Sequence, residues 1–259
     1  MKEFTLITGA SSGIGLEIAR YMASKNHDVI LVARRRTNLE KLQKEIKDRY
    51  QTDVKVYDRD LSNPAVAVEL FNEIRNEGIN VSMLVNNAGF GDYGEFKDLP
   101  MDRSLDMISV NISSLVALSR LFLEDAVTLN RGRILNVASI LSFFPFPNYA
   151  VYAATKAFVL SFSESLRAEL SETGISVSAL CPGPTDTEFT TEEMLKSNSY
   201  KGFKQMDAAE VARQGVDGMM KGKDIIIPGL MNKIITQTPR FTPRSITRRV
   251  NKYMSGQKK

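Results

Sequence analysis

The first fifteen residues constrain the fold more than any other part of the chain, because they join a strand, a glycine-rich turn and the start of a helix. Residues 4–7 form a mostly apolar, strand-like run, and Gly9, Gly13 and Gly15 follow them. Gly9 permits a tight exit from the strand, Gly13 lets the backbone approach a pyrophosphate, and Gly15 lets the helix pack close to the sheet. The helix N-terminus offers N–H donors to the phosphates. The alternative is a glycine turn with a serine cap.

Strands and helices alternate along the rest of the chain. Seven short, β-branched runs are separated by stretches with helical periodicity, such as Phe158, Phe162 and Leu166. Such alternation favours right-handed crossovers and helices on both faces of a parallel sheet. We predict an α/β fold with a single doubly wound parallel β-sheet of six to seven strands, of the Rossmann type. The runs are residues 4–7, 29–32, 54–57, 83–85, 133–137, 176–180 and 224–227.

Charge divides the chain at about Gly229. The 259 residues include 34 basic and 30 acidic ones, and residues 229–259 hold eight basic residues and no acid, which leaves 26 basic and 30 acidic in the rest. A body with an acidic excess is a poor surface for nucleic acid, so we expect no nucleic-acid partner. We predict that residues 1–228 form one ligand-binding domain and that residues 229–259 are a basic extension of it, not a separate domain.

Other features of the sequence narrow the class of protein. Cys181 is the one cysteine, which rules out a disulfide framework and a cysteine-based zinc site, and we expect no metal. No apolar run reaches the about 20 residues that cross a bilayer, and the first residues show no signal-peptide pattern. We expect a cytoplasmic protein.

The end of the second predicted strand indicates which dinucleotide the chain binds. An NAD site places an acid there to hold the ribose 2′-hydroxyl, whereas this chain has Ala33 followed by Arg34 and Arg35. Guanidinium groups suit a 2′-phosphate, so we predict NADP(H), held first by Arg34 and second by Arg35. The alternative is a solvated basic turn. The segments after the third and fourth strands are expected beside the adenine and along the cofactor edge of the sheet: Asp60 and Leu61, then Asn87, Ala88 and Gly89.

Tyr152 and Lys156 are four residues apart and therefore stack on one helix face. A free phenol has a pKa near 10, too high for ready proton exchange at neutral pH. An ammonium about 6 Å away, at an effective dielectric of about 20, lowers that pKa to about 8, within the range of a general acid or base. Ser139, after the fifth strand, is placed to hydrogen-bond a substrate oxygen. The alternatives are a Tyr–Lys pair on a surface helix and a loop-capping serine.

Several short motifs follow one another in a fixed order between residue 5 and about residue 190. They are Thr8-Gly9-x-x-x-Gly13-Ile14-Gly15, Asn86-Asn87-Ala88-Gly89, Asn111, Ser139, Tyr152-x-x-x-Lys156 and Pro182-Gly183. Each is weakly specific alone, but together they resemble the short-chain dehydrogenase/reductase family. The segment after Asn87 and the segment Pro228-Gly229-Leu230 are similar to a bacterial, ketoacyl-reductase-like subgroup of that family.

The resemblance implies a Ser–Tyr–Lys triad, extended by an asparagine, that serves an NADP(H)-dependent oxidoreductase. Tyr152 then donates the proton, Ser139 polarises the carbonyl, Lys156 binds the nicotinamide ribose and lowers the phenol pKa, and Asn111 holds a water in the proton relay. It also implies a homodimer or homotetramer formed through the helices at 101–127 and 150–171. Further residues expected at the cofactor are Ser11, Ser12 and Ile14 in the glycine turn, and Pro182, Gly183, Thr185 and Thr187 near the carboxamide.

Aromatic residues near the predicted site suggest an apolar substrate pocket. They are Phe90 and Tyr93 after the fourth strand, and Phe143, Phe144, Phe146 and Tyr149 between Ser139 and Tyr152. We predict the NADPH-dependent reduction of a hydrophobic ketone, aldehyde or ketoacyl group. For half of these aromatics, the core or a subunit contact is an equal alternative. The polar segment 185–206 is a candidate mobile flap.

Two other classes of function stay open. One is a cofactor-binding, redox-sensing protein with little turnover, since a fold does not fix a function; the complete set of Ser139, Tyr152 and Lys156 argues against it. The other is a protein that contacts a membrane surface through the basic extension, where Phe241 and Val250 stand among cations. The alternative to membrane contact is an extension that packs on its own body or on a neighbouring subunit and has a solvated outer face.

Overall fold

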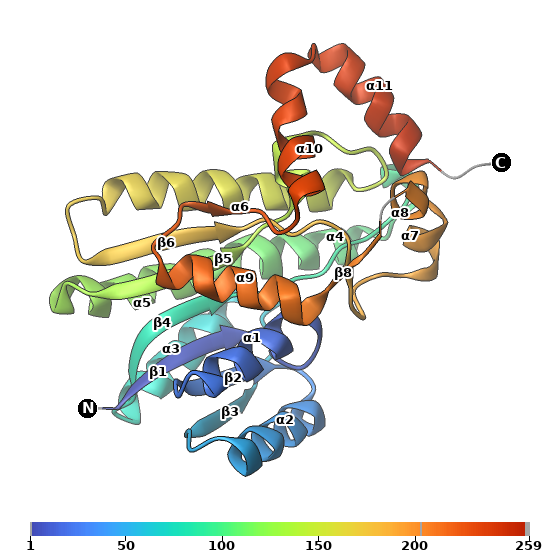
Figure 1. The fold of residues 1–259 in the computed structure, drawn as a ribbon. Helices are drawn as coiled ribbons and strands as arrows, with labels where there is room; N and C mark the ends of the chain where they lie inside the picture. The colour runs from blue at the N-terminus through green and yellow to red at the C-terminus, as the bar shows by residue number, and fades with distance from the viewer. Residues whose placement is uncertain (1, 203, 257–259) are drawn as a thin grey trace.

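The computed structural model describes residues 2–202 and 204–256, and it has three layers, with a parallel sheet between two layers of helices (Figure 1). The seven strands have the order β3-β2-β1-β4-β5-β6-β9, and all neighbouring strands are parallel. The predicted Rossmann-type fold is confirmed. The strands are β1 (Glu3–Thr8), β2 (Asp28–Ala33), β3 (Val54–Asp58), β4 (Asn80–Asn86), β5 (Gly132–Val137), β6 (Ile175–Leu180) and β9 (Ile225–Ile226).

Helices cover both faces of the sheet because its central strands are apolar on both sides. On one face, Ile18, Leu39 and Val211 share a core with side chains of the strands. On the other face, Phe122 and Leu166 do the same. The first layer comprises α1 (Gly13–Ser24), α2 (Arg36–Arg49) and α9 (Ala208–Met220). The second comprises α3 (Pro64–Asn76), α5 (Leu115–Leu129) and α6 (Ala150–Glu169).

The order of the strands fixes where a ligand binds. From β1 the chain moves outward to β2 and β3, and then returns to β4 on the other side of β1. The loops that leave the carboxyl ends of β1 and β4 therefore diverge, and a crevice opens between them. The glycine turn after β1 and the segment after β4 lie on the two sides of this crevice.

The helix predicted at 101–127 is a continuous helical segment in three parts. They are α4 (Met101–Ile108), a π-helical segment η2 (Ser109–Ser114) and α5. By length and composition alone, the segment Met101–Leu129 could cross a membrane, with a mean hydropathy of 1.4 in its most apolar stretch. Its buried side chains, such as Met107, Leu118 and Phe122, pack within the α/β domain.

The second half of the chain adds a small two-stranded pair and a helical hairpin near the carboxyl ends of the strands (Figure 1). β7 (Thr185–Asp186) pairs with β8 (Met206–Asp207), so the predicted flap 185–206 is closed at its base. It contains α7 (Glu192–Lys196) and α8 (Asn198–Gly202). In the extension, α10 (Leu230–Phe241) and α11 (Arg244–Ser255) follow β9; residues 257–259 lie outside the described residues. Two short 3-10 helices, η1 (Phe96–Asp98) and η3 (Ile140–Phe143), complete the fold.

Candidate active site

The glycine turn between β1 and α1 is held against the end of β4 by Asn87. The Asn87 amide donates to the carbonyl oxygens of Thr8 at 3.0 Å and Gly9 at 3.2 Å. Gly9 has a φ of +67°, and a Cβ on Gly15 would lie 2.3 Å from the Asn87 Nδ2 atom. A larger residue at either position would therefore push these two loops apart.

The N-terminus of α1 is suited to bind phosphate. Its N-cap residue, Ser12, makes no side-chain cap bond, and the first turn of α1 contains no acid. The first N–H groups of a helix have no partner within the helix and carry the positive end of its dipole. Gly13 has a φ of +55°, and a Cβ there would lie 3.1 Å from Thr187 on the far side of the crevice. The turn therefore fits the pyrophosphate of a dinucleotide.

The two arginines after β2 differ in their contacts. Arg35 donates to the hydroxyls of Ser11, at 3.2 Å, and Ser12, at 2.7 Å, and pairs with Glu188 at 2.7 Å. Arg34 is more exposed, and its nearest acidic oxygen, on Asp60, is 4.0 Å away. Arg35 thus lies against the phosphate-binding turn, whereas Arg34 faces the outer edge of the crevice.

One cavity of about 1130 Å³ contains most of the predicted cofactor residues. Gly15 is absent from its wall because it packs beneath the turn, against Gly9 and Asn87. The cavity exceeds the 300–1,000 Å³ of a typical small-molecule site, which leaves room for a dinucleotide and a substrate. The predicted cofactor residues on its wall are Gly9, Ser11, Ser12, Gly13, Ile14, Arg34, Arg35, Asp60, Leu61, Asn87, Ala88, Gly89, Tyr152, Lys156, Pro182, Gly183, Thr185 and Thr187.

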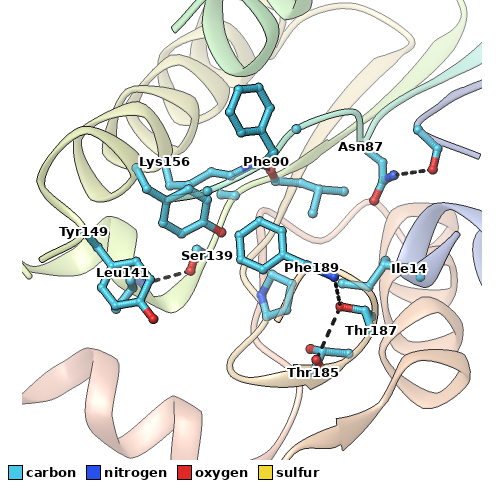
Figure 2. Close-up of a pocket in the computed structure, with 18 of the residues that line it drawn as sticks. Ile14, Asn87, Phe90, Ser139, Leu141, Tyr149, Lys156, Thr185, Thr187 and Phe189 are labelled. Carbon is cyan, nitrogen blue, oxygen red and sulfur yellow. Dashed lines mark hydrogen bonds between the residues drawn. The ribbon is translucent and has the colours of Figure 1, made fainter. Parts of the chain in front are cut away.

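Ser139, Tyr152 and Lys156 meet on the wall of the same cavity, and Figure 2 labels Ser139 and Lys156 among the residues that line it. Ser139 follows β5 as the N-cap of η3, and its hydroxyl accepts a hydrogen bond from the Leu141 N–H at 3.1 Å. Tyr152 and Lys156 lie one turn apart on α6. The Lys156 Nζ atom is 5.8 Å from the centroid of the Tyr152 ring and donates to the Val137 carbonyl at 2.8 Å.

Burial dominates the protonation of both α6 residues. It raises the pKa of the Tyr152 phenol, against a smaller lowering by the hydrogen bond from Ser139. It lowers the pKa of Lys156 to about 8. The sequence-based expectation that the phenol pKa is lowered is not met here, because desolvation of the Tyr152 phenol is the largest effect and raises its pKa. Tyr152 is therefore protonated at neutral pH.

Asn111 lies in the π-helical segment η2, where its side chain is buried and fully engaged. Its Nδ2 donates to the Phe90 carbonyl at 3.1 Å and to the Thr155 hydroxyl at 3.0 Å, and its Oδ1 accepts from the Phe90 N–H at 3.2 Å. Asn111 therefore ties the segment after β4 to α6, which carries Tyr152 and Lys156. π-helical turns occur often at functional sites.

Four of the six predicted pocket aromatics line the cavity, and two do not. Phe90, Phe144, Phe146 and Tyr149 are on its wall. The prediction is wrong for Phe143 and Tyr93. Phe143 is half-buried and packs between two clusters, one with Val159 and Leu160 and one with Phe144 and Phe146. Tyr93 stands behind the wall, with its ring 5.1 Å from that of Tyr149 and its hydroxyl on the Ser255 carbonyl.

The sequence analysis missed the outer wall of the cavity. Phe189 and Tyr200 from the flap lie against it, with the Phe189 ring 5.4 Å from that of Tyr152. The aromatic at Phe189, two residues after Thr187, was the available signal. The hairpin of α10 and α11 supplies the rest of this wall, although the sequence analysis treated residues 229–259 only as a basic extension. Its lining residues are Asn232, Ile235, Thr238, Thr247, Val250, Asn251 and Met254.

Comparison with known proteins agrees with this geometry. Residues 3–198 match the family model described as short chain dehydrogenase. An NADP-dependent 3-hydroxy acid dehydrogenase from Schizosaccharomyces pombe is 30% identical over 233 residues, 86% of this chain and 88% of that protein.

Two solved structures are similar over most of their length. One is a short-chain dehydrogenase from Sphingobium yanoikuyae in complex with NADPH, with a TM-score of 0.80, 30% identity and coverage of 92% of this chain and 93% of that chain. The other is a bulky-bulky ketone specific alcohol dehydrogenase from Comamonas testosteroni, with a TM-score of 0.78, 27% identity and coverage of 92% of each chain. The resemblance seen in the sequence motifs is confirmed: this chain belongs to the short-chain dehydrogenase/reductase family.

Proposed function

We propose that this protein is an NADP(H)-dependent oxidoreductase that reduces the carbonyl group of a hydrophobic substrate. The observation that carries the proposal is the desolvated Tyr152 phenol, which meets Ser139 in a cavity with an apolar inner wall. Carbonyl reduction needs a proton donor at this place, because the oxygen takes up a proton as the carbon takes up a hydride.

The cofactor is NADP(H), and the turn after β2 supports this choice. Ala33 ends the strand where an NAD site has an acid. Arg35 lies against Ser11 and Ser12, so its guanidinium is within reach of a phosphate next to the glycine turn, and Arg34 stands beside it. When bound, the cofactor supplies the hydride. A solved relative with NADPH and a relative described as NADP-dependent agree with this choice.

Each side chain of the triad has surroundings that suit one role. Burial keeps Tyr152 protonated, so it donates the proton to the carbonyl oxygen. Ser139 accepts a hydrogen bond from Leu141, and its proton, which is directed to the Tyr152 phenol in the free site, turns to the same carbonyl oxygen when substrate binds. Lys156 lies close to the segment after β4, since a Cβ on Gly89 would be 3.4 Å from its Nζ, and it binds the nicotinamide ribose. Asn111 positions Phe90 and α6 and supports the proton relay.

The wall beyond the triad favours an apolar substrate. Residues 140–149 and the hairpin contribute no charged side chain to the cavity. Phe144, Phe146 and Tyr149 form one buried aromatic cluster, with ring centroids 5.7–6.2 Å apart between neighbours. Such a wall contributes little binding free energy to a small polar carbonyl compound, and more to an alkyl or aryl chain that buries apolar surface against it.

The subunits associate through the faces of α4 and α6 that the monomer leaves exposed. Leu105 is 53% exposed, Ile108 39% and Phe158 40%, and the Phe158 ring stacks on that of Phe162. Apolar side chains gathered on neighbouring helices favour an intersubunit contact. We propose a homodimer or homotetramer formed through these helices.

A substrate panel with NADPH oxidation as the readout tests the function. We expect alkyl and aryl ketones or aldehydes to be reduced, and small polar carbonyls to react at least tenfold more slowly at equal concentration. Turnover of small polar carbonyls alone contradicts the assignment of the pocket. NADPH binding without turnover of any carbonyl supports the cofactor-binding, redox-sensing alternative.

A further inference from the structure

The C-terminal hairpin, defined as α10, α11 and the turn between them (residues 230–255), projects from the edge of the layered domain (Figure 1). Its last turn is fastened to the body. The Ser255 carbonyl accepts hydrogen bonds from the Tyr93 hydroxyl at 2.7 Å and the Asn148 amide at 3.1 Å, and Asn198 donates to the Tyr253 carbonyl at 2.8 Å. The outer surface of the hairpin is thus held in one orientation beside the cavity.

This outer surface is unusually apolar. Seven of the seventeen large hydrophobic side chains that are exposed among the described residues belong to the hairpin. Phe241, in the last turn of α10 before the connection, is 86% exposed, the highest value among them. On α11, the exposed side chains follow one helix face at positions i, i+4 and i+7. The seven are Leu230, Met231, Ile234, Phe241, Ile246, Val250 and Tyr253.

The same surface is strongly cationic. The hairpin carries six basic residues and no acidic one, and no ion pair between described residues involves any of the six. Lys258 and Lys259 add two further cations in the sequence after it. The six are Lys233, Arg240, Arg244, Arg248, Arg249 and Lys252.

The hairpin also reaches the substrate cavity. Ile235 and Met254 join the aromatic cluster of Tyr149 and Phe146 on the inner side. Val250 lines the cavity and is also 52% exposed, so it stands at the rim where the cavity meets the outer surface of α11. An apolar path therefore leads from the outer face of the hairpin to Tyr149.

We propose that the outer face of the hairpin docks on an anionic lipid bilayer, so that the cavity takes its hydrophobic substrate from the membrane. The apolar side chains enter the headgroup region while the surrounding cations meet lipid phosphates, which is how amphipathic interfacial helices bind. A second copy is a poorer partner, because a two-fold contact would bring two uncompensated cationic surfaces together. The source of substrate rests on the proposed function; the docking itself does not.

Co-sedimentation of the full chain with vesicles, without substrate, tests the docking. One set of vesicles is pure phosphatidylcholine, and the other contains phosphatidylglycerol as well. We expect binding to the anionic vesicles at least tenfold stronger than to the zwitterionic ones, and weakened by high salt. Arg248→Glu with Arg249→Glu is expected to reduce anionic binding about 25-fold or more, since each basic residue contributes about fivefold.

Matched variants separate this surface from general charge and apolarity. Lys41→Glu with Lys44→Glu makes the same charge change on the exposed face of α2. Because only the net charge of the chain changes, we expect its binding to anionic vesicles to stay within about twofold of that of the intact chain. Phe241→Ser is expected to weaken binding roughly fivefold, whereas Phe96→Ser, which alters a 66% exposed phenylalanine elsewhere, is expected to have no effect. None of these six residues lines the cavity.

The outcomes are distinct. Equal sedimentation with both vesicle types, or equal losses from the α11 and α2 charge reversals, overturns the docking. Self-association that Phe241→Ser abolishes, without vesicle binding, also overturns it and assigns the surface to a second copy. A chain that binds anionic vesicles but reduces no carbonyl leaves the docking standing and defeats the proposed function instead. If the docking and the proposed function both hold, Arg248→Glu with Arg249→Glu slows the reduction of a ketone dissolved in the bilayer but not the reduction of a water-soluble ketone.

Discussion

At the scale of single residues, the buried amine of Lys156 affects stability as well as activity. Its side chain is 5% exposed and burial lowers its pKa to about 8, whereas the unfolded chain restores a pKa of about 10.4. Below pH 8 both states hold the proton, and the folded state bears the full cost of the buried charge. Between about pH 8 and 10.4 the unfolded chain binds more protons than the folded one, so stability from this residue rises with pH.

We therefore expect Lys156→Met to gain stability relative to the intact chain at pH 7, by up to about 3 kcal/mol, although it loses activity. The gain should shrink as the pH rises from about 8 towards 10. Free energies of unfolding from urea titrations at several pH values measure this trend. Lys44→Met, at an exposed position of α2, serves as a control without the trend. A gain that is constant or increases with pH contradicts the explanation.

The arginines after β2 divide the recognition of the 2′-phosphate unequally. Arg35 contacts the glycine turn and Arg34 does not, so the order predicted from the sequence is reversed in our expectation. Arg35→Ala should weaken NADPH binding by about tenfold to a hundredfold, from the loss of a charged hydrogen bond. Arg34→Ala should have a smaller effect.

Calorimetric titration of each variant with NADPH and NADH measures this selectivity. Arg36→Ala is the control, because Arg36 pairs with Glu40 and Asp58 and is not on the cavity wall. Equal losses for the two cofactors in Arg35→Ala would mean that the arginine only supports the turn. Equal affinity of the intact chain for NADPH and NADH would contradict the assignment of NADP(H) as the preferred cofactor.

The sequence predicts the reactive residues better than the pocket around them. Gly9 and the pair Tyr152 and Lys156 depend on local requirements, a left-handed φ and a four-residue helical spacing. Phe143 and Phe144 look alike in the sequence, but only the turn of η3 decides which ring faces the cavity. Met254 meets Tyr149 from about a hundred residues further along the chain, and no local pattern foretells that contact.

At the scale of elements, the strands were predictable because a buried parallel strand is a short apolar run. Each of the seven predicted runs overlaps a strand of the sheet, although β9 is reduced to Ile225–Ile226 at the edge. The π-helical turn at Asn111 was not predictable, because the hydrophobic periodicity of residues 101–127 continues through it. The helices of the flap are short and stabilised by tertiary contacts, which leaves little signal in their sequence.

At the scale of elements, the hydrogen bonds that hold the last turn of α11 against the body can be tested by mutation. Tyr93→Phe removes the hydrogen bond to the Ser255 carbonyl and keeps the ring against Tyr149. One such bond is worth about 1 kcal/mol, so opening of α11 should become about fivefold more frequent. Hydrogen exchange over residues 244–255 measures the opening.

The KM for a hydrophobic ketone should rise in the same variant, while NADPH affinity is unchanged. Tyr50→Phe, at the C-terminal end of α2 and away from the cavity, is the control. Unchanged exchange over residues 244–255 in Tyr93→Phe would show that the other bonds of the last turn hold α11 without it.

At the scale of the whole molecule, acidic and cationic charge lie in different parts of the chain. The acidic excess lies in residues 1–228 and the cationic, apolar surface lies in the hairpin next to the cavity. A different apolar surface, on α4 and α6, serves the proposed association of subunits. The two surfaces use different helices, so both contacts can be made by one molecule.

Phe158→Glu with Leu105→Glu is expected to convert the oligomer to a monomer at micromolar concentration, because it places charges in an apolar contact. Light scattering after gel filtration gives the mass. The matched control is Val68→Glu on α3 with Met220→Glu on α9, which are each 38% exposed and lie outside α4 and α6. A monomeric intact chain would refute the proposed assembly and leave the chemistry untouched.

The most direct test of the central claim compares Tyr152→Phe with the intact chain on the best hydrophobic carbonyl of the panel. The phenol hydroxyl is the one group removed, and a general acid contributes about 10²–10⁴-fold to a rate. We predict that the NADPH oxidation rate falls at least a hundredfold, with NADPH affinity changed by less than about threefold. A variant that keeps more than a tenth of the rate would show that another group supplies the proton, and the proposed role of Tyr152 would be wrong.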